Sequence, residues 1–409
     1  MKKNGLKHTA AQGLTIVLAL VLMLALMPVM SEKAMADDGI DDAATSFTMN
    51  DCTYTILDTD NPSVRLDTYL GSDSELTIPQ TVTHEGITYT VVKIGLLGSY
   101  ESPLVRVELP DTVTELSSGS FSNLARLQTV ILSKRITKIP AYCFLSCHAL
   151  KTVKNMNQVT SIGAEAFSDT GFTSFTLPAN LTKLKSNVFA DCAKLKTVTL
   201  SRKMKSIDTS AFSFSGIRTF KVKRGSKYFA ADKYLLYNKK KTRIIAYAPG
   251  RTNRSYTVPG NVTSIGKNAF KYNTHLKKVI IRKNVRTIGT GAFEGSSITS
   301  VTLTGKTRLI GSHAFEHCYK LKSVSLGKKV HTIQTCAFVT DSLKSVRIPR
   351  NVKKIGKRAF GYYWYDGLDE EDLTIVPMIG KKTGFRIYGK KGSAAHKYAK
   401  ANGFKFVKY

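Results

Sequence analysis

Phenylalanine recurs along this chain at a nearly constant interval. Each recurrence follows Ala, Ser, Val or Cys, and apart from one gap the spacing is 22 or 23 residues. A fixed interval in this range is typical of a solenoid, in which each repeat forms one coil that stacks on the next. The recurring residues are Phe121, Phe144, Phe167, Phe189, Phe212, Phe270, Phe293, Phe315, Phe338 and Phe360.

The aligned repeats share the pattern L-x-x-V-x-(L/I)-(P)-x-x-V-x-x-I-G-x-x-A-F, as in LKKVIIRKNVRTIGTGAF. The alternation in V-x-(L/I) predicts a short strand whose apolar side chains face inward. The later V-x-x-I and A-F positions predict apolar anchors across a turn on the opposite wall. Stacking would pair the strands in parallel at about 4.8 Å and place the phenylalanines in a column. The predicted fold is therefore a solenoid with a parallel β-sheet on one wall, turns or short helices on the other, and a cap at each end.

The same pattern divides the chain into segments. Residues 37–92 are predicted to form an N-terminal β cap, since CTYTILDTDNPSVRLDTYL contains two alternating runs. Residues 93–363 form the predicted solenoid, and the gap in the repeat contains KYLLYNKKKTRIIAYAPG, which predicts an inserted hairpin at about 225–256. Residues 364–409 are predicted to form a C-terminal cap of strand, helix and strand, with Ser393 as the N-cap and Gly403 as the helix stop.

The N-terminal segment has the pattern of an export signal. Lysines precede the apolar run LTIVLALVLMLALMPVM, and AMA at 34–36 offers the small residues that a signal peptidase recognises. We expect residues 1–36 to be a signal peptide that is cleaved after Ala36, and the mature protein to be secreted or held at the surface of a bacterium without being an integral membrane protein. An uncleaved membrane anchor is the alternative, because the apolar run approaches the length that spans a bilayer.

Charge is strongly uneven along the chain, whose formal net charge is +32. Residues 37–120 contain 15 acidic and three basic residues, whereas residues 121–409 contain 54 basic and 13 acidic residues. Such a surface attracts polyanions. For an exported protein these would be wall phosphate polymers, sulfated glycans, acidic proteins or extracellular DNA, and we expect no intracellular nucleic acid as a partner.

One motif suggests catalysis and is better explained by the repeat. The segment SHAFEHC at 312–318 contains H-x-x-E-H, a zinc-protease signature that requires a long helix. Its Ala-Phe pair is the core pair of a coil, and the equivalent positions of another coil are KNAFKYN. The histidines are then variable positions on either side of the pair. An alternative is that His313, with Cys336 on the next coil and His317 nearby, holds a transition metal ion.

The remaining chemistry favours a binding protein. The six cysteines show no spacing that would pair them on neighbouring coils, so we expect small buried thiols rather than disulfides. Cys147-His148 has no orienting third residue nearby, and GTGAFEG lacks the glycine spacing of a dinucleotide loop. We therefore predict no enzyme activity, no catalytic residue, no cofactor and no metal.

Three rows of polar residues run across the predicted coils. Ser or Thr precedes the strand Val in eight coils and predicts an outward hydroxyl row: Thr129, Thr152, Ser174, Thr197, Thr219, Ser300, Ser323 and Ser345. Basic residues flank this row on both sides in five coils, as Lys196 with Arg202, Arg218 with Arg224, Lys277 with Lys283, Lys322 with Lys328, and Lys344 with Arg350. We expect their charges to add along one row and to bind an extended anion. Ser and Thr also suit exposed strands, and lysines keep sheet edges soluble, which is the alternative explanation.

The repeats, the inserted LLYNKKKTRIIAYAPG and the ending GSAAHKYAKANGFKF together resemble the BspA-like leucine-rich-repeat surface proteins of bacteria. The resemblance implies a leucine-rich-repeat solenoid and a non-enzymatic role in surface adhesion, with binding of host matrix or plasma proteins. Two functions then compete. One is a secreted or cell-surface adhesion protein that engages host extracellular proteins or anionic glycans. The other is a structural envelope protein held by charge to the anionic wall polymers of the producing cell.

Overall fold

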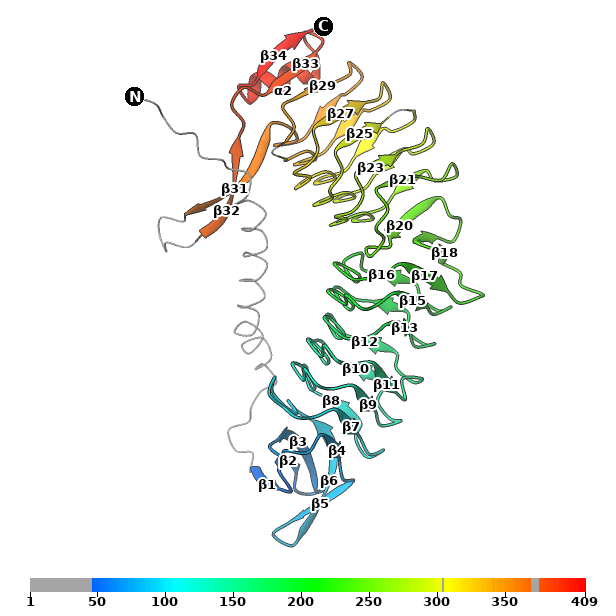
Figure 1. Ribbon diagram of the computed structural model, residues 1–409, viewed down its shortest axis with the longest axis vertical. Helices are drawn as coiled ribbons and strands as arrows, with labels where there is room; N and C mark the ends of the chain where they lie inside the picture. Colours follow the sequence, from blue (N-terminus) through cyan, green and yellow to red (C-terminus); the bar gives the residue numbers. More distant parts are fainter. Residues whose placement is uncertain (1–45, 304, 341, 369–374) are drawn as a thin grey trace.

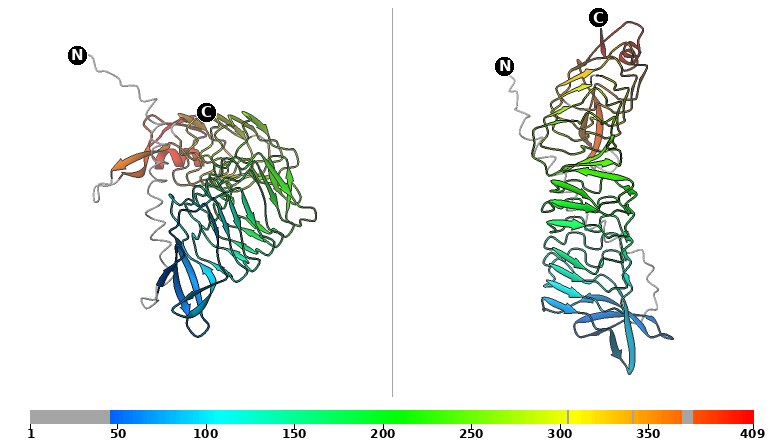
Figure 2. Two further views of the ribbon diagram at one scale, coloured as in Figure 1. Left: turned by 60° about the horizontal axis from the view of Figure 1, so that its bottom comes forward. Right: turned by 90° about the vertical axis from the view of Figure 1, so that its right-hand side faces the viewer.

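The coils of this protein stack into one curved solenoid with a cap at each end (Figures 1 and 2). The structure, a computed structural model, describes residues 46–303, 305–340, 342–368 and 375–409. The predicted signal peptide, residues 1–36, lies outside this range. In the part of the chain that is described, no helix is long and apolar enough to cross a membrane.

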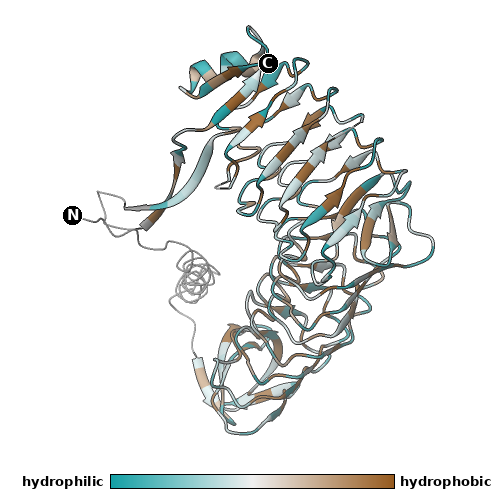
Figure 3. Ribbon diagram, turned by 45° about the horizontal axis from the view of Figure 1, so that its top comes forward, coloured by the Kyte–Doolittle hydropathy of each residue, from teal (hydrophilic) through white to brown (hydrophobic). Residues whose placement is uncertain are grey.

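One wall consists of the predicted V-x-(L/I) strands, which pair in parallel and in register. Val130, for example, lies between Val107 and Val153 of the neighbouring coils. Hydrophobic residues line up from strand to strand across this wall (Figure 3). The wall has three sheets: β4 (Glu75–Thr77), β7 (Arg106–Glu108), β9 (Thr129–Ile131) and β11 (Thr152–Lys154); β13 (Ser174–Thr176), β15 (Thr197–Leu200) and β17 (Thr219–Val222); and β21 (Ser255–Thr257), β23 (Lys278–Ile280), β25 (Ser300–Leu303), β27 (Ser323–Leu326) and β29 (Ser345–Arg347), continued by two cap strands.

A second set of strands forms the other wall, where turns or short helices were expected. Each strand has only two residues, and its Ile or Leu packs toward the core before the chain turns into the Ala-Phe pair. The strands are β8 (Glu115–Leu116), β10 (Lys138–Ile139), β12 (Ser161–Ile162), β14 (Lys183–Leu184), β16 (Ser206–Ile207), β22 (Ser264–Ile265), β24 (Thr287–Ile288), β26 (Leu309–Ile310), β28 (Thr332–Ile333) and β30 (Lys354–Ile355). The solenoid is thus confirmed. In the described residues of this wall, two-residue strands are followed by turns, and the short helices that were the other expectation are not formed.

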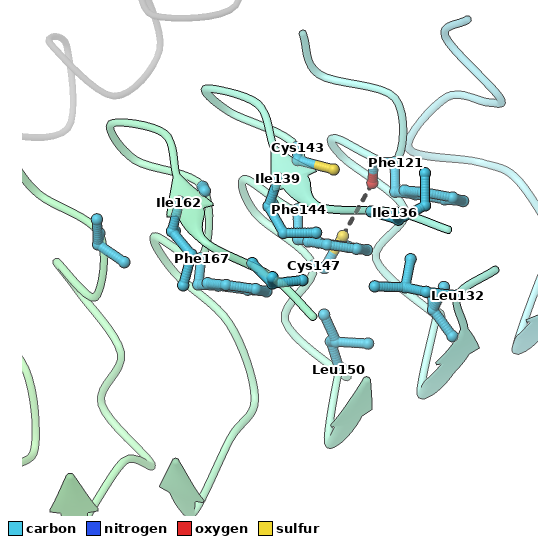
Figure 4. Packing of buried hydrophobic residues seen from close by; sticks show 14 of the residues in the cluster. Phe121, Leu132, Ile136, Ile139, Cys143, Phe144, Cys147, Leu150, Ile162 and Phe167 are labelled. Atoms are coloured by element: carbon cyan, nitrogen blue, oxygen red, sulfur yellow. Dashed lines mark hydrogen bonds between the residues drawn. The ribbon is translucent and has the colours of Figure 1, made fainter. Parts of the chain in front are cut away.

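The predicted phenylalanine column runs through the core. All ten rings are at most 2% exposed. Neighbouring rings lie nearly parallel, with centroids 5.1 Å apart for Phe121 and Phe144 and 5.2 Å apart for Phe144 and Phe167 (Figure 4). The spacing is close to the separation of the paired strands, because each ring belongs to one coil. Each coil therefore buries its aromatic ring only by contact with the coils on either side.

Thiols satisfy backbone groups beside this column. The Cys147 thiol donates to the carbonyl oxygen of Phe121 over 2.9 Å (Figure 4). Cys192 and Cys318 donate in the same way to the phenylalanine carbonyl of the preceding coil, each over 3.0 Å. All six cysteines are buried and unpaired, as expected. Burial raises the pKa of Cys192 to about 11 and that of Cys318 to about 12.

The gap in the repeat contains three antiparallel strands, β18 (Phe229–Asp232), β19 (Leu235–Asn238) and β20 (Arg243–Tyr247). The predicted hairpin corresponds to β19 and β20, and β18 is additional. β20 pairs in parallel with β22 and so begins a new ladder of two-residue strands. The Tyr247 ring takes the aromatic position, 5.1 Å from Phe270. The long-strand wall is not continuous here, because β17 ends one sheet and β21 begins the next.

Both caps are mainly β structure. The N-terminal cap contains β1 (Ser46–Met49), β2 (Cys52–Asp58), β3 (Ser63–Tyr69), β5 (Thr81–His84) and β6 (Ile87–Ile94). The C-terminal cap contains the hairpin β31 (Tyr362–Leu368) and β32 (Ile375–Lys381), followed by β33 (Arg386–Gly389), α2 (Ala394–Ala401) and β34 (Lys405–Lys408). Ser393 is the N-cap of α2, and Gly403 adopts a φ of +61° just beyond its end. Because β33 pairs with β29 and β34 with β33, the cap extends the long-strand wall.

Replacing a ring of the column should be costly. Phe293 is fully buried between Phe270 and Phe315, with centroid distances of 4.9 and 5.2 Å. We expect Phe293→Ala to lower the free energy of unfolding by about 3–5 kcal/mol, since a cavity would remain between two coils. Denaturant unfolding followed by circular dichroism measures this. A loss below about 1 kcal/mol would mean that the ring does not bridge its neighbours.

The buried thiols should be unreactive while the protein is folded. Because their pKa values lie far above neutrality, we expect Cys192 and Cys318 to resist iodoacetamide at pH 8 and to react once guanidinium unfolds the chain. Peptide mass spectrometry after timed alkylation locates each modified cysteine. Modification of either residue in the native protein at the rate of free cysteine would contradict the packing described here.

Candidate polyanion-binding surface

The hydroxyl row lies on the outward face of the long-strand wall. Thr129 is opposite Thr152, Thr197 is opposite both Ser174 and Thr219, and Ser300 is opposite Ser323. Their chain neighbours Val130, Val198 and Val301 are buried, so the hydroxyl residues point away from the core. In the seven-stranded sheet Lys278 takes this position between Ser255 and Ser300. The face is therefore a row mainly of small polar groups, interrupted by Lys278 and continued by Arg106 at one end and by Arg386 and Lys405 of the cap strands at the other.

The ten predicted basic residues flank this row at the two ends of the strands. Nine of them are exposed and Lys277 is partly buried. None forms an ion pair with an acidic side chain of the described residues, whereas Lys134 on an earlier coil lies 3.4 Å from Asp111. Their charge is therefore available to a partner from outside.

The expected single row is in fact divided. Lys196, Arg202, Arg218 and Arg224 flank the three-stranded sheet, and the other six residues flank the seven-stranded sheet beyond the insertion. Within the seven-stranded sheet, the Thr299 amide donates to the Lys277 carbonyl and the Lys322 amide to the Thr299 carbonyl, so one neutral coil separates the two lysines. This correction arises because β18–β20 occupy the space where the next long strand would pair. The ten basic residues therefore form two separate groups, and their charges do not add along one continuous row.

Both groups contain basic residues that the sequence pattern did not include. The Lys277 amide donates to the carbonyl of Arg254, which places Arg254 one coil earlier on the same rim. The Lys306 amide donates likewise to the Lys283 carbonyl on the other rim. Arg254 precedes Ser255 as the other rim residues precede their Ser or Thr, and this would have identified it had the insertion not obscured the alignment. Beside the three-stranded sheet, an open cavity of about 510 Å³ is lined by Lys221, Lys223, Arg224 and Lys239.

Crowding of like charges changes the acidity of one rim lysine. The pKa of Lys277 is lowered, first by its partial burial, then by the positive charge of Lys320 and finally by that of Arg254. Lys320 comes from the turn before β27 and was also missing from the predicted set. Lys277, Lys320 and Arg254 are therefore close neighbours on this rim.

The two rims are too far apart to hold one thin ligand between them. Lys283 is six positions after Lys277, and a strand rises about 3.3 Å per residue, so the chain between them spans up to about 20 Å. A single extended glycan can follow one rim, while a broad acidic surface can contact both.

The H-x-x-E-H segment is a turn and not a helix. Phe315 stacks in the column, and His313 and His317 have φ values of +58° and +54°, which a helix does not allow. The arrangement that a zinc protease requires is therefore not formed by residues 312–318.

The alternative prediction was a transition metal site formed by His313, Cys336 and His317. His313 does lie next to Cys336, but His317 turns toward Tyr319 and Trp364.

Comparison with known proteins identifies the family. The family model described as "BspA type Leucine rich repeat region (6 copies)" matches residues 81–195, 114–243 and 243–363. The chain belongs to the BspA-type leucine-rich-repeat proteins. Proteins of this type are generally non-enzymatic scaffolds for interactions with other molecules. A search of curated proteins finds no significant relative of this BspA-type protein.

Two solved structures share the fold. A leucine-rich cell surface protein from Faecalibacterium prausnitzii A2-165 is 22% identical, with a TM-score of 0.55 over 90% of this chain and 96% of that one. The pneumococcal vaccine antigen PcpA is 17% identical, with a TM-score of 0.51 over 89% of this chain and 98% of its own. At these identities the similarity shows that the solenoid is shared.

The crowding around Lys277 gives a direct test of the rim geometry. We expect Lys320→Gln to raise the pKa of Lys277 because it removes the nearby positive charge, while partial burial keeps that pKa below its ordinary value. Carbon-13 methylation of the lysines, followed by titration with nuclear magnetic resonance, measures this pKa. Lys390→Gln in the C-terminal cap is the control and should leave Lys277 unchanged. An unchanged Lys277 pKa in Lys320→Gln would show that the two side chains are not neighbours.

Proposed function

We propose that this BspA-type protein is a secreted or cell-surface, non-enzymatic binding protein of a bacterium. It engages host extracellular proteins or anionic glycans through the outward face of its seven-stranded sheet. The observation that supports this most is the set of rim cations at both strand ends of that sheet, which are exposed apart from the partly buried Lys277 and lack acidic partners among the described residues. The N-terminal apolar segment and the family's occurrence among bacterial surface proteins support export.

Stacking makes these cations act together. Neighbouring coils are about 4.8 Å apart, well inside the screening length of about 8 Å at physiological ionic strength. Lys322 and Lys344 lie on neighbouring coils and reinforce each other, whereas Lys277 and Lys322, with a neutral coil between them, are about 10 Å apart and are more strongly screened. The summed field draws in an anionic partner and makes its affinity fall steeply with salt.

The width of the face favours a partner with a broad acidic surface or one with several chains. Between the rims, a second outward row contains the hydroxyls of Thr257, Thr302 and Ser325, with the exposed Ile280 between the first two. Hydroxyls donate and accept hydrogen bonds and so suit carboxylate, sulfate and amide groups equally. The rims would supply the attraction, and these rows would supply the short-range contacts.

Charge reversal tests which part of the surface binds. Heparin serves as the probe for anionic glycans, wall teichoic acid for envelope polymers, and a panel of matrix and plasma proteins for host partners. We expect Lys277→Glu, Lys283→Glu, Lys322→Glu and Lys328→Glu together to reduce binding at least 100-fold, as measured by surface plasmon resonance at several salt concentrations. The four changes lie at exposed or partly buried rim positions, and circular dichroism verifies that the variant is folded.

The matched control reverses four exposed lysines of the C-terminal cap, Lys390, Lys391, Lys397 and Lys400, with the same change in net charge. We expect it to lower affinity less than tenfold. A third variant reverses Lys196, Arg202, Arg218 and Arg224 and tests the group beside the three-stranded sheet. Equal losses in all three variants would show that binding follows net charge alone. Binding to teichoic acid only, lost in high salt, would favour the envelope function over adhesion.

A further inference from the structure

Three possible metal ligands converge on the turn edge of the solenoid, away from the basic rims. One ligand atom each from His313, Glu316 and Cys336 lies within 4.8 Å of the other two. His313 and Cys336 occupy the same repeat position, two residues before Phe315 and Phe338, on neighbouring coils. Both have left-handed backbones, with φ of +58° and +53°, so their side chains leave the coils in the same direction. The register of the column therefore brings an imidazole and a thiol side by side.

Glu316 is the residue that makes this cluster unusual. It is 5% exposed, and a buried carboxylate requires a cation or hydrogen-bond donors around it. Its Oε2 lies 2.6 Å from His313 Nδ1. Its Oε1 accepts a hydrogen bond from Trp364 Nε1 over 3.0 Å. The carboxylate is thus fixed on one oxygen, its other oxygen contacts the imidazole, and the Cys336 thiol lies in the same cluster.

Trp364 acts from outside the coil. It belongs to β31, in the hairpin that follows the last coil, and 48 residues separate it from Glu316 in the chain. In metal centres a donor in this position orients a ligating carboxylate and holds it ready for the ion. The adjacent His317 ring stacks on Trp364 at 5.4 Å and helps to fix the indole. The cluster therefore has an inner set of ligand atoms and an outer support built from different parts of the chain.

We propose that His313, Glu316 and Cys336 form a binding site for a divalent transition metal ion of the zinc type. Imidazole nitrogen, carboxylate oxygen and thiolate sulfur together suit zinc or cobalt and not calcium or magnesium. His313 is 41% exposed on its side chain, so the fourth position of a tetrahedral ion opens to water. On binding, the thiol of Cys336 releases its proton. The ion would link two coils and, through Trp364, the C-terminal hairpin.

The sequence pattern alone favours no metal, and its alternative of a metal site includes His317 as the third ligand. The geometry assigns that place to Glu316.

The test uses the purified full chain, freed of metal by a chelator and kept reduced, and titrated with cobalt(II) chloride. We expect one equivalent to bind, with a thiolate-to-cobalt charge-transfer band that zinc then abolishes. Cys336→Ser should lose this band, and Glu316→Gln should weaken cobalt binding at least tenfold. Trp364→Phe should weaken it by about tenfold because only the outer support is removed. Zinc should also raise the melting temperature of the wild type but not that of Cys336→Ser.

His317→Ala is the matched control: it alters the same turn, leaves all three ligands in place and removes only the ring that stacks on Trp364. A cobalt affinity that falls no further than in Trp364→Phe, with the charge-transfer band retained, supports the assignment. Loss of binding in His317→Ala with retention in Glu316→Gln would overturn it in favour of the two-histidine set. Absence of the charge-transfer band in the wild type, or its persistence in Cys336→Ser, would also overturn the proposal. If Cys336→Ser does not fold, His313→Ala decides the matter, because this side chain is partly exposed and lies outside the phenylalanine column.

Discussion

Contact between the phenylalanine rings of successive coils is the interaction on which the solenoid depends. A coil of 22 or 23 residues cannot enclose an apolar ring by itself, so each ring is buried by its neighbours. The ring spacing of 4.7–5.2 Å along the second half of the column matches the spacing of paired strands. Packing and hydrogen bonding therefore impose the same register. Once that register is set, every position of the repeat becomes a straight row of side chains.

The insertion shows how this constraint is met when the repeat is interrupted. Between Phe212 and Phe270 the chain makes three antiparallel strands, and the aromatic position beside Phe270 is taken by Tyr247. β20 also supplies the first partner of the next ladder of two-residue strands, through Ile244 beside Ile265. Core packing thus resumes at once on the far side of the insertion. In the long-strand wall, none of the three inserted strands joins the sheet of β17 to the sheet of β21. The basic surface is divided for that reason.

The sequence alone predicts the features whose residues recur at a fixed interval. The phenylalanine interval and the V-x-(L/I) alternation predicted the column, the long-strand wall and the hydroxyl row. The second wall was not predicted as strands, because a two-residue strand such as Lys138–Ile139 is too short to show an alternation. Arg254 was missed because it follows an insertion of irregular length. Glu316 was missed for another reason: its partner Trp364 comes from a hairpin outside the repeat, and no interval connects the two.

Straight rows also determine how charge is distributed across each coil. On the turn edge of the middle coils, Glu165, Asp169 and Asp191 lie together, and burial, then Asp169 and Glu165, raise the pKa of Asp191. The ends of the long strands carry uncompensated cations instead. Like charges on neighbouring coils repel one another, and this repulsion is removed only when ions of opposite charge lie along the row. On the function proposed above, this arrangement would orient an acidic partner toward the strand ends, because the turn edge of the middle coils carries acidic residues.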